Sequence, residues 1–92
     1  MSEVLALGLS HKTAPLELRE RLALPEGRAA RLMAELTDSG DASEATVIST
    51  CNRTEIYVFA HDPVVAESSI LSALASQGGI SPTELAGHLY SL

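Results

Sequence analysis

The chain has 92 residues, enough for one small domain, and 46% of them are hydrophobic although there is only one Phe, two Tyr and no Trp. Its core must therefore be built from Leu, Ile, Val and Ala. Twelve acidic residues against six basic ones give a net charge of −6, which argues against nonspecific nucleic-acid binding, and the single cysteine excludes an internal disulfide. Because the chain has one cysteine and does not open with a charged segment followed by an apolar one, a cytoplasmic, reducing setting is expected. No apolar run is long enough to span a bilayer, so no membrane contact is expected.

The first part of the chain predicts one strand followed by two helices. Val4–Leu9 is an almost unbroken apolar run, too short for a helix, which is typical of a strand buried on both faces. Pro15 lies where a first helical turn tolerates a missing N–H, and this short helix is expected to end near Pro25. A second helix starts at Pro25 and stops at Ser39-Gly40. Its apolar stripe consists of Ala29, Leu32, Met33 and Leu36.

These helices also hold most of the positive charge. Four of the six basic residues lie between Arg19 and Arg31. A local patch can oppose the total charge, so a specific nucleic-acid contact is not excluded by the net charge of the chain. The sequence alone favours a solvated helix face over a nucleic-acid patch.

The rest of the chain predicts two strands, two helices and a short last segment. Residues 45–48 and 54–60 are rich in β-branched or aromatic side chains, which indicates two strands with a tight connection. Asp62-Pro63 is expected to begin a helix that ends at Gly78-Gly79. Residues 81–84, Ser-Pro-Thr-Glu, have the form of a capping box and predict a short helix. Residues 88–92 form either a final edge strand or the start of a longer element.

The order of these elements predicts an α+β fold. It is the ferredoxin-like split βαβ arrangement (β-α-β-β-α-β), an antiparallel sheet with helices packed on one face. In that topology the first and third strands are central, and they are the two most continuously apolar segments here. No repeat or linker divides residues 1–92, so one domain is expected.

The densest group of reactive side chains is Ser-Thr-Cys-Asn-Arg-Thr-Glu at residues 49–55, between the second and third strands. A cation and loop N–H groups near Cys51 would favour the thiolate, the form that attacks carbonyls. A lone cysteine is more often a small buried hydrophobe, but Asn52 and Arg53 beside it favour a functional thiol. Arg53 suits bidentate binding of a carboxylate, and its alternatives are an ion pair with Glu55 or an exposed charge.

Other reactive side chains carry weaker signals. His11, His61 and His88 are scattered without metal-ligand spacing, so no metal site is expected. The glycines fit neither a dinucleotide loop nor a phosphate-binding loop, so the chain is not expected to bind a nicotinamide cofactor alone.

Two segments resemble one known family. Residues 8–15, Gly-Leu-Ser-His-Lys-Thr-Ala-Pro, followed by Leu18-Arg19-Glu20, resemble the opening of the glutamyl-tRNA reductases. Residues 47–57, Val-Ile-Ser-Thr-Cys-Asn-Arg-Thr-Glu-Ile-Tyr, resemble the nucleophile segment of that family almost residue for residue. The resemblance extends over nearly the whole chain.

The resemblance implies a function for the chain and roles for its residues. The family reduces the glutamyl ester on tRNA(Glu) to glutamate-1-semialdehyde with NADPH, the first step of tetrapyrrole (porphyrin and heme) biosynthesis by the C5 pathway. Cys51 would attack the acyl carbonyl and hold glutamate as a thioester. Thr50, Asn52 and Arg53 would line the substrate pocket, with Arg53 facing the glutamate carboxylate.

The resemblance also implies parts that these 92 residues do not hold. The chain would be a C-terminally truncated N-terminal catalytic, glutamate-recognition domain, without the NADPH-binding and dimerisation domains of the family. A homodimer and contact with the downstream glutamate-1-semialdehyde aminomutase are implied for the full-length protein. Two alternatives stay open: a non-catalytic ferredoxin-like binding or regulatory module, and a thiol redox protein, which the absence of a resolving cysteine disfavours.

Overall fold

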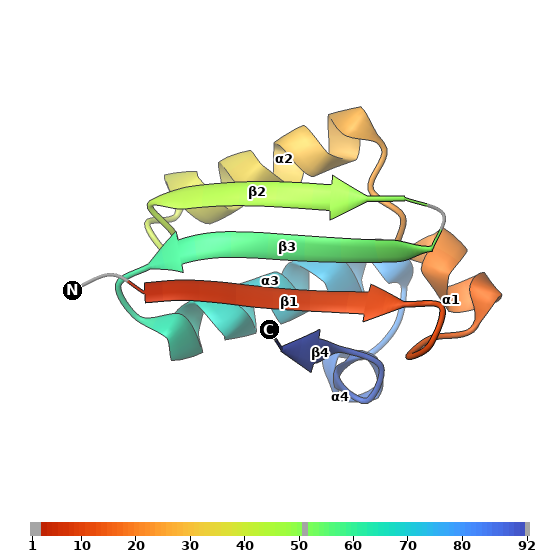
Figure 1. Ribbon diagram of the computed structural model, residues 1–92. Coiled ribbons are helices and arrows are strands. Elements are labelled where there is room, and N and C mark those ends of the chain that lie inside the picture. The colour runs from red at the N-terminus through yellow and green to blue at the C-terminus, as the bar shows by residue number, and fades with distance from the viewer. Residues whose placement is uncertain (1–2, 51, 92) are drawn as a thin grey trace.

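The computed structural model describes residues 3–50 and 52–91, which form one layer of strands and one layer of helices (Figure 1). The elements in chain order are β1 (Glu3–Ser10), α1 (Leu16–Arg21), α2 (Glu26–Asp38), β2 (Glu44–Ser49), β3 (Arg53–Ala60), α3 (Pro63–Gly78), α4 (Pro82–Ala86) and β4 (Tyr90–Ser91). The predicted order of elements is therefore confirmed, with two helices in the first crossover and two in the second.

The strands lie in the order β2-β3-β1-β4, and every described pairing is antiparallel. This is the strand order of the split βαβ arrangement, so the predicted fold class is confirmed. β1 and β3 are central, as expected, and pair along their full length from Glu3 opposite Ala60 to Ser10 opposite Arg53. β4 pairs only with Leu7 and Gly8 of β1.

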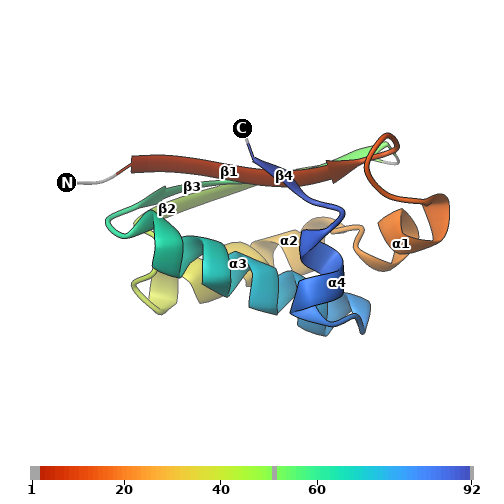
Figure 2. The same cartoon turned by 90° about the horizontal axis from the view of Figure 1, so that it is seen from below.

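All helices cover the same face of the sheet, and the opposite face is open (Figure 2). The core lies between the two layers, and Leu9, Leu22, Ile56, Ile70 and Leu85 are its largest fully buried side chains. The prediction that the first strand is buried on both faces is wrong for Val4, which is 70% exposed. Val4 alternates onto the open face, where no helix covers it.

Local signals fix where the second crossover starts and stops. The Asp62 carboxylate accepts hydrogen bonds from the N–H groups of Val64 and Val65 at 3.1 and 3.3 Å, which caps α3. Gly79 ends α3 with a φ of 64°, a left-handed conformation that favours glycine. Ser81 Oγ accepts from the N–H of Glu84 at 3.2 Å, so α4 begins as the capping sequence predicts.

Candidate functional site

The connection between β2 and β3 is closed by Thr50. Its N–H donates to the Arg53 carbonyl oxygen at 2.8 Å, and its side-chain oxygen Oγ1 accepts from the N–H groups of Asn52 and Arg53, both at 3.2 Å. These bonds satisfy the backbone polar groups of a tight turn. The Thr50 hydroxyl takes the place of a second backbone acceptor. Thr50 therefore shapes the turn, and the exposed side chains of Asn52 and Arg53 extend from it.

The loop that leaves β1 lies against this turn. Ser10 is paired with Arg53 at the end of the sheet, and the His11 N–H donates to the Asn52 carbonyl oxygen at 2.8 Å. Residues 8–15 and 47–57, which are distant in sequence, are thus in direct contact. The two segments that resemble the reductase family therefore lie side by side.

The same loop is held from its other side by the C-terminal part of the chain. The Thr13 side-chain oxygen accepts from the Ser10 N–H at 2.9 Å, which folds the loop back on itself. The Thr13 carbonyl oxygen lies 3.0 Å from His88 Nδ1, within hydrogen-bond distance. His88 follows α4, so the second crossover anchors the loop that contacts the turn.

Beneath the turn, on the helix-covered face, two hydroxyls join the hairpin to the helices. Ser49 Oγ accepts from the Leu24 N–H at 3.1 Å and is 3.1 Å from Thr54 Oγ1. Thr54 is buried, 3% exposed, so its hydroxyl needs this partner. The bond to Leu24 fixes the connection between α1 and α2 to the base of the turn.

On the open face, the base of the turn carries a buried carboxylate. Glu55 is only 6% exposed, and its two oxygens accept from Tyr57 Oη at 3.0 Å and from Tyr90 Oη at 2.6 Å. Gly8 lies between Glu55 and Tyr90 in the strand register. A Cβ at Gly8 would come within 2.9 Å of both side chains, so glycine is what allows their contact.

These hydrogen bonds set the ionisation of the three groups. The bond from Tyr90 holds the pKa of the Glu55 carboxyl below its ordinary value, although burial opposes this, and the Tyr57 bond and the Arg53 charge act in the same direction as Tyr90. Burial, reinforced by the bond to Glu55, raises the pKa of Tyr90 to about 12. The bond to Glu55 raises the pKa of Tyr57. Glu55 is therefore an ionised carboxylate held by two neutral phenols at neutral pH.

Comparison with known proteins identifies the family. The model of the glutamyl-tRNA(Glu) reductase N-terminal domain matches residues 7–92. The chain belongs to this family. It is 46% identical over 88 residues to a glutamyl-tRNA reductase of Myxococcus xanthus and 41% identical over 85 residues to one of Synechococcus sp. strain CC9605. These matches cover 96% and 92% of the chain but only 19% and 20% of the relatives, so the chain spans about a fifth of their length.

A solved structure agrees on the fold. The crystal structure of TsrL superposes on 91% of this chain and 24% of its own, with a TM-score of 0.54 and 21% sequence identity. At that identity the likeness supports the architecture of this reductase-family domain and nothing about its chemistry.

The predicted site residues of this family domain fall into two groups. Thr50, Asn52 and Arg53 lie together at the turn, and their role in a substrate pocket stays a prediction, whereas Cys51, the predicted nucleophile, lies outside the described residues. Arg53 is exposed, which is one of the alternatives that the sequence left open, and the Glu55 carboxylate accepts hydrogen bonds from two tyrosines. Tyr90 was not predicted as a partner of Glu55, because no local sequence pattern links residues that are 35 positions apart.

Gly8, Gly78 and Gly79 do not form the phosphate-binding turn of a nicotinamide dinucleotide. Such cofactors place their phosphates at a helix N-terminus after a glycine-rich turn. Gly8 instead lies inside β1 against Tyr90, and Gly78 and Gly79 are at the C-terminal end of α3, where carbonyl groups repel phosphate. Among residues 3–50 and 52–91, no helix is long and apolar enough to cross a membrane. The same residues contain no cluster of three side chains that could hold a metal ion.

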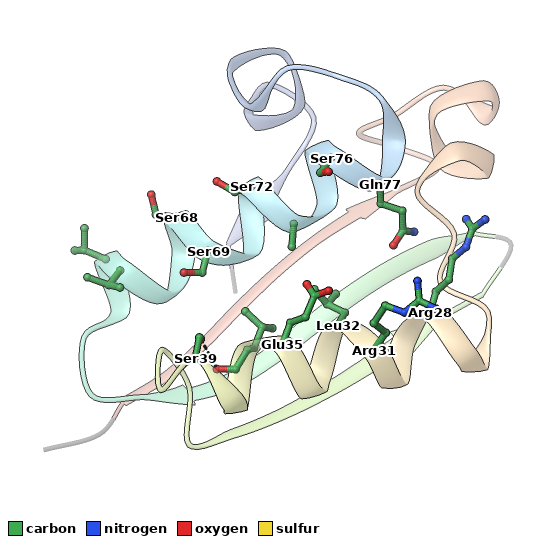
Figure 3. A pocket seen from close by; sticks show the side chains of 14 residues that line it. Arg28, Arg31, Leu32, Glu35, Ser39, Ser68, Ser69, Ser72, Ser76 and Gln77 are labelled. Atoms are coloured by element: carbon green, nitrogen blue, oxygen red, sulfur yellow. Dashed lines mark hydrogen bonds between the residues drawn. The ribbon is translucent and has the colours of Figure 1, made fainter.

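A separate groove of about 950 Å³ lies between α2 and α3, on the helical side of the molecule (Figure 3). Arg28 and Arg31 of α2 line it near Gln77, where α3 approaches its end, and serine side chains of α3 line the opposite wall. It is open, its lining combines apolar side chains with arginine, serine and glutamine, and none of the described residues of the β2–β3 turn lines it.

Proposed function

We propose that this chain is the acyl-transfer domain of a glutamyl-tRNA reductase, in which Cys51 receives the glutamyl group of glutamyl-tRNA(Glu). The observation that carries the proposal is the bond between the His11 N–H and the Asn52 carbonyl oxygen. It joins the two segments that resemble the family. One of these segments contains the residue that the family pattern assigns as the nucleophile. Family membership and 36–46% identity to named reductases support it further.

The chemistry is one nucleophilic substitution at an ester. The Cys51 thiolate attacks the carbonyl carbon of the glutamyl ester, the bond from that carbon to the ribose oxygen breaks, and the ribose hydroxyl leaves with a proton from solvent. The product on the protein is a glutamyl thioester. The thiolate is the attacking form, so the reaction requires Cys51 to lose its proton before the attack.

The residues around the turn take distinct parts in this proposal. Arg53 binds the side-chain carboxylate of glutamate, because a guanidinium matches a carboxylate with two parallel hydrogen bonds. Asn52 contributes an exposed amide to the substrate pocket. Thr50 acts through the turn, since its hydroxyl already accepts from the N–H groups of Asn52 and Arg53.

The complete reaction belongs to the whole protein. We propose NADPH-dependent reduction to glutamate-1-semialdehyde, in the C5 pathway of tetrapyrrole biosynthesis, in the cytoplasm. We place the nicotinamide site outside these 92 residues because Gly8, Gly78 and Gly79 do not fit a dinucleotide. A dimerisation domain outside these residues is part of the same proposal. A homodimer and contact with glutamate-1-semialdehyde aminomutase belong to the same proposal.

The test is the mass of the intact protein after incubation with glutamyl-tRNA(Glu), beside a Cys51→Ser control. The expected result is a glutamyl adduct on the wild type alone, which hydroxylamine releases as a thioester. The full-length protein is measured in parallel. If both the chain and the full-length protein stay unmodified while folded, the alternative of a non-catalytic binding module is correct.

A further inference from the structure

We propose that the end of the domain that carries the β2–β3 turn is also its RNA-docking surface, where the basic side chains outside the turn hold the phosphate backbone of the tRNA. This inference rests on the proposed function and names the part of the domain that the nucleic acid contacts. We call this surface the cationic end. It consists of Lys12, Arg19, Arg21, Arg28, Arg31 and Arg53.

The charges of the chain are separated along the sequence. All six Lys and Arg residues lie in residues 10–31 and 49–55, together with four carboxylates, one of which is the buried Glu55, whereas the remaining eight carboxylates lie in segments that have no Lys or Arg. The net charge of −6 therefore conceals a positive end and a strongly negative remainder. A polyanion would be attracted to one end and repelled from the rest, which orients it on approach.

The fold gathers these segments at one place. Arg53 opens β3 opposite Ser10, the last residue of β1, and Lys12 follows in the loop that contacts the turn. The connection before α2 is bonded to the base of the turn through the Leu24 N–H and Ser49 Oγ. Arg28, in the first turn of α2, is thus four residues after a residue that contacts the hairpin.

Hydrogen bonds hold two of the cations in place at this end. Arg19 Nε donates to the Ala14 carbonyl oxygen at 3.2 Å, and the Arg21 guanidinium donates to the Gly79 carbonyl oxygen at 2.9 Å, at the end of α3. Arg28 and Arg31 are exposed and three residues apart on α2, so they line the same side of the groove (Figure 3).

The opposite end has the reverse charge. Glu3 opens β1, Glu44 opens β2 opposite Phe59, and Asp62 caps α3 directly after β3 ends. Because strands β1 and β2 both run away from this end, the acidic groups lie a full strand length from the turn. The proposed acyl-acceptor turn and the positive charge are on the same side, which is where an RNA carrying an activated acyl group must approach.

Phosphate is the partner that fits this arrangement best. Arginine and lysine contact phosphate oxygens in nucleic-acid complexes, and neutral donors such as serine and glutamine add to them. The groove beside Arg28 and Arg31 supplies such donors from Ser72, Ser76 and Gln77, whose Nε2 also donates to the Ala23 carbonyl oxygen. Its lining also includes the Glu35 carboxylate, so the two arginines leave one net positive charge there. The contact would position the RNA and carry no sequence information by itself.

The test compares two double variants with the same change in net charge. Arg28→Gln with Arg31→Gln removes two positive charges at the cationic end. Val64→Glu with Ser68→Glu adds two negative charges at the other end of the same groove, at exposed positions of α3. Binding of labelled tRNA(Glu) to the protein is measured between about 50 and 200 mM salt.

The expected result is about tenfold weaker tRNA binding by the first variant, with the slope of log Kd against log salt reduced by about 1 to 2. The second variant should bind as the wild type does. Lys12→Gln, in a loop ahead of α1, is an independent variant expected to act in the same direction as the first. Equal binding by all variants, or equal weakening by both double variants, would overturn the docking surface.

A small glutamyl ester without RNA separates this inference from the proposed function. If the docking surface is correct and Cys51 is the nucleophile, the Arg28/Arg31 double variant acquires the adduct from the small ester at the wild-type rate, while its reaction with glutamyl-tRNA slows. An adduct with unchanged tRNA binding overturns the surface alone. Weakened tRNA binding without any adduct on the wild type supports the surface and overturns the acyl-transfer function.

Discussion

The Tyr90 hydroxyl donates to a carboxylate oxygen of Glu55 at 2.6 Å, across the width of β1. This bond connects the last strand of the domain to the strand that follows the candidate site. The carboxylate is buried, so it depends on its donors for the solvation that it loses on folding. Glu55 also lies two residues after Arg53, on the same face of β3. The position of β3, which begins at Arg53, is therefore coupled to the C-terminal end of the chain.

Tyr90→Phe removes this donor and leaves the ring in place. We expect the free energy of unfolding to fall by about 1 kcal/mol, because a hydrogen bond to a charged group is lost at a partly solvated position. Tyr57→Phe is the matched control, and its longer bond of 3.0 Å predicts a smaller loss. Urea denaturation at pH 7 measures both. A larger loss for Tyr57→Phe would show that the shorter bond from Tyr90 is not the stronger of the two.

The raised pKa of Tyr90 predicts a loss of stability in alkali. Its pKa is about 12 in the folded protein against 10.0 for an ordinary tyrosine. Stabilisation by the neutral phenol is therefore complete below about pH 10 and disappears as the pH rises towards 12. The difference in unfolding free energy between wild type and Tyr90→Phe should shrink over this interval. A difference that stays constant from pH 9 to 12 would contradict the raised pKa.

The lowered pKa of Glu55 predicts the opposite dependence in acid. Its contribution is present above the ordinary carboxyl pKa of 4.5 and is lost as the pH falls through the lower value of the folded protein. The acid midpoint of unfolding should therefore move to higher pH in Tyr90→Phe, because the strongest cause of the lowered pKa is removed. Circular dichroism during acid titration measures the midpoint, and an unchanged midpoint would assign the lowered pKa to other groups.

Gly8→Ala tests the space between Glu55 and Tyr90. The added Cβ would lie 2.9 Å from atoms of both side chains, so one of them must move. We expect a loss of about 1–3 kcal/mol, the usual cost of overpacking. Gly27→Ala is the control, since a Cβ there meets nothing within 4 Å, and helix α2 should gain about 0.5 kcal/mol. Equal effects of the two substitutions in thermal denaturation would show that the Gly8 site can relax freely.

The sequence was sufficient to predict the order of elements because its local signals agree with one another. The Asp62 cap and the left-handed Gly79 bound α3 where the pattern indicates, and the apolar runs of the first and third strands are central in the sheet. What it did not reveal is which face of a strand stays open. Val4 continues the apolar run of β1, and only the placement of every helix on one side leaves it exposed.

The candidate site shows the same division between local and long-range information. The turn residues Thr50, Asn52 and Arg53 were identifiable because they are contiguous. The hydrogen-bond partner of Glu55 was not identifiable. Arg53 is two residues away in sequence, whereas Tyr90, which donates the hydrogen bond, is 35 residues away. Contacts at such separations depend on strand register, which composition and periodicity leave undetermined.

The last prediction concerns how Arg53 distinguishes its substrate. Arg53 is exposed, so Arg53→Ala should leave the unfolding free energy within about 0.5 kcal/mol of the wild type. It should lower the rate of acyl transfer from a small glutamyl ester by about 10- to 100-fold, the worth of a charge-assisted pair, and leave a glutaminyl ester nearly unaffected. Arg53→Lys keeps the charge without the paired hydrogen bonds. Its rate with the glutamyl ester should therefore lie between the rates of the wild type and Arg53→Ala. Arg28→Ala removes an arginine from α2 and should leave the preference for glutamyl over glutaminyl ester unchanged. If Arg53→Ala slows both esters equally, Arg53 acts on the thiol and not on the glutamate carboxylate.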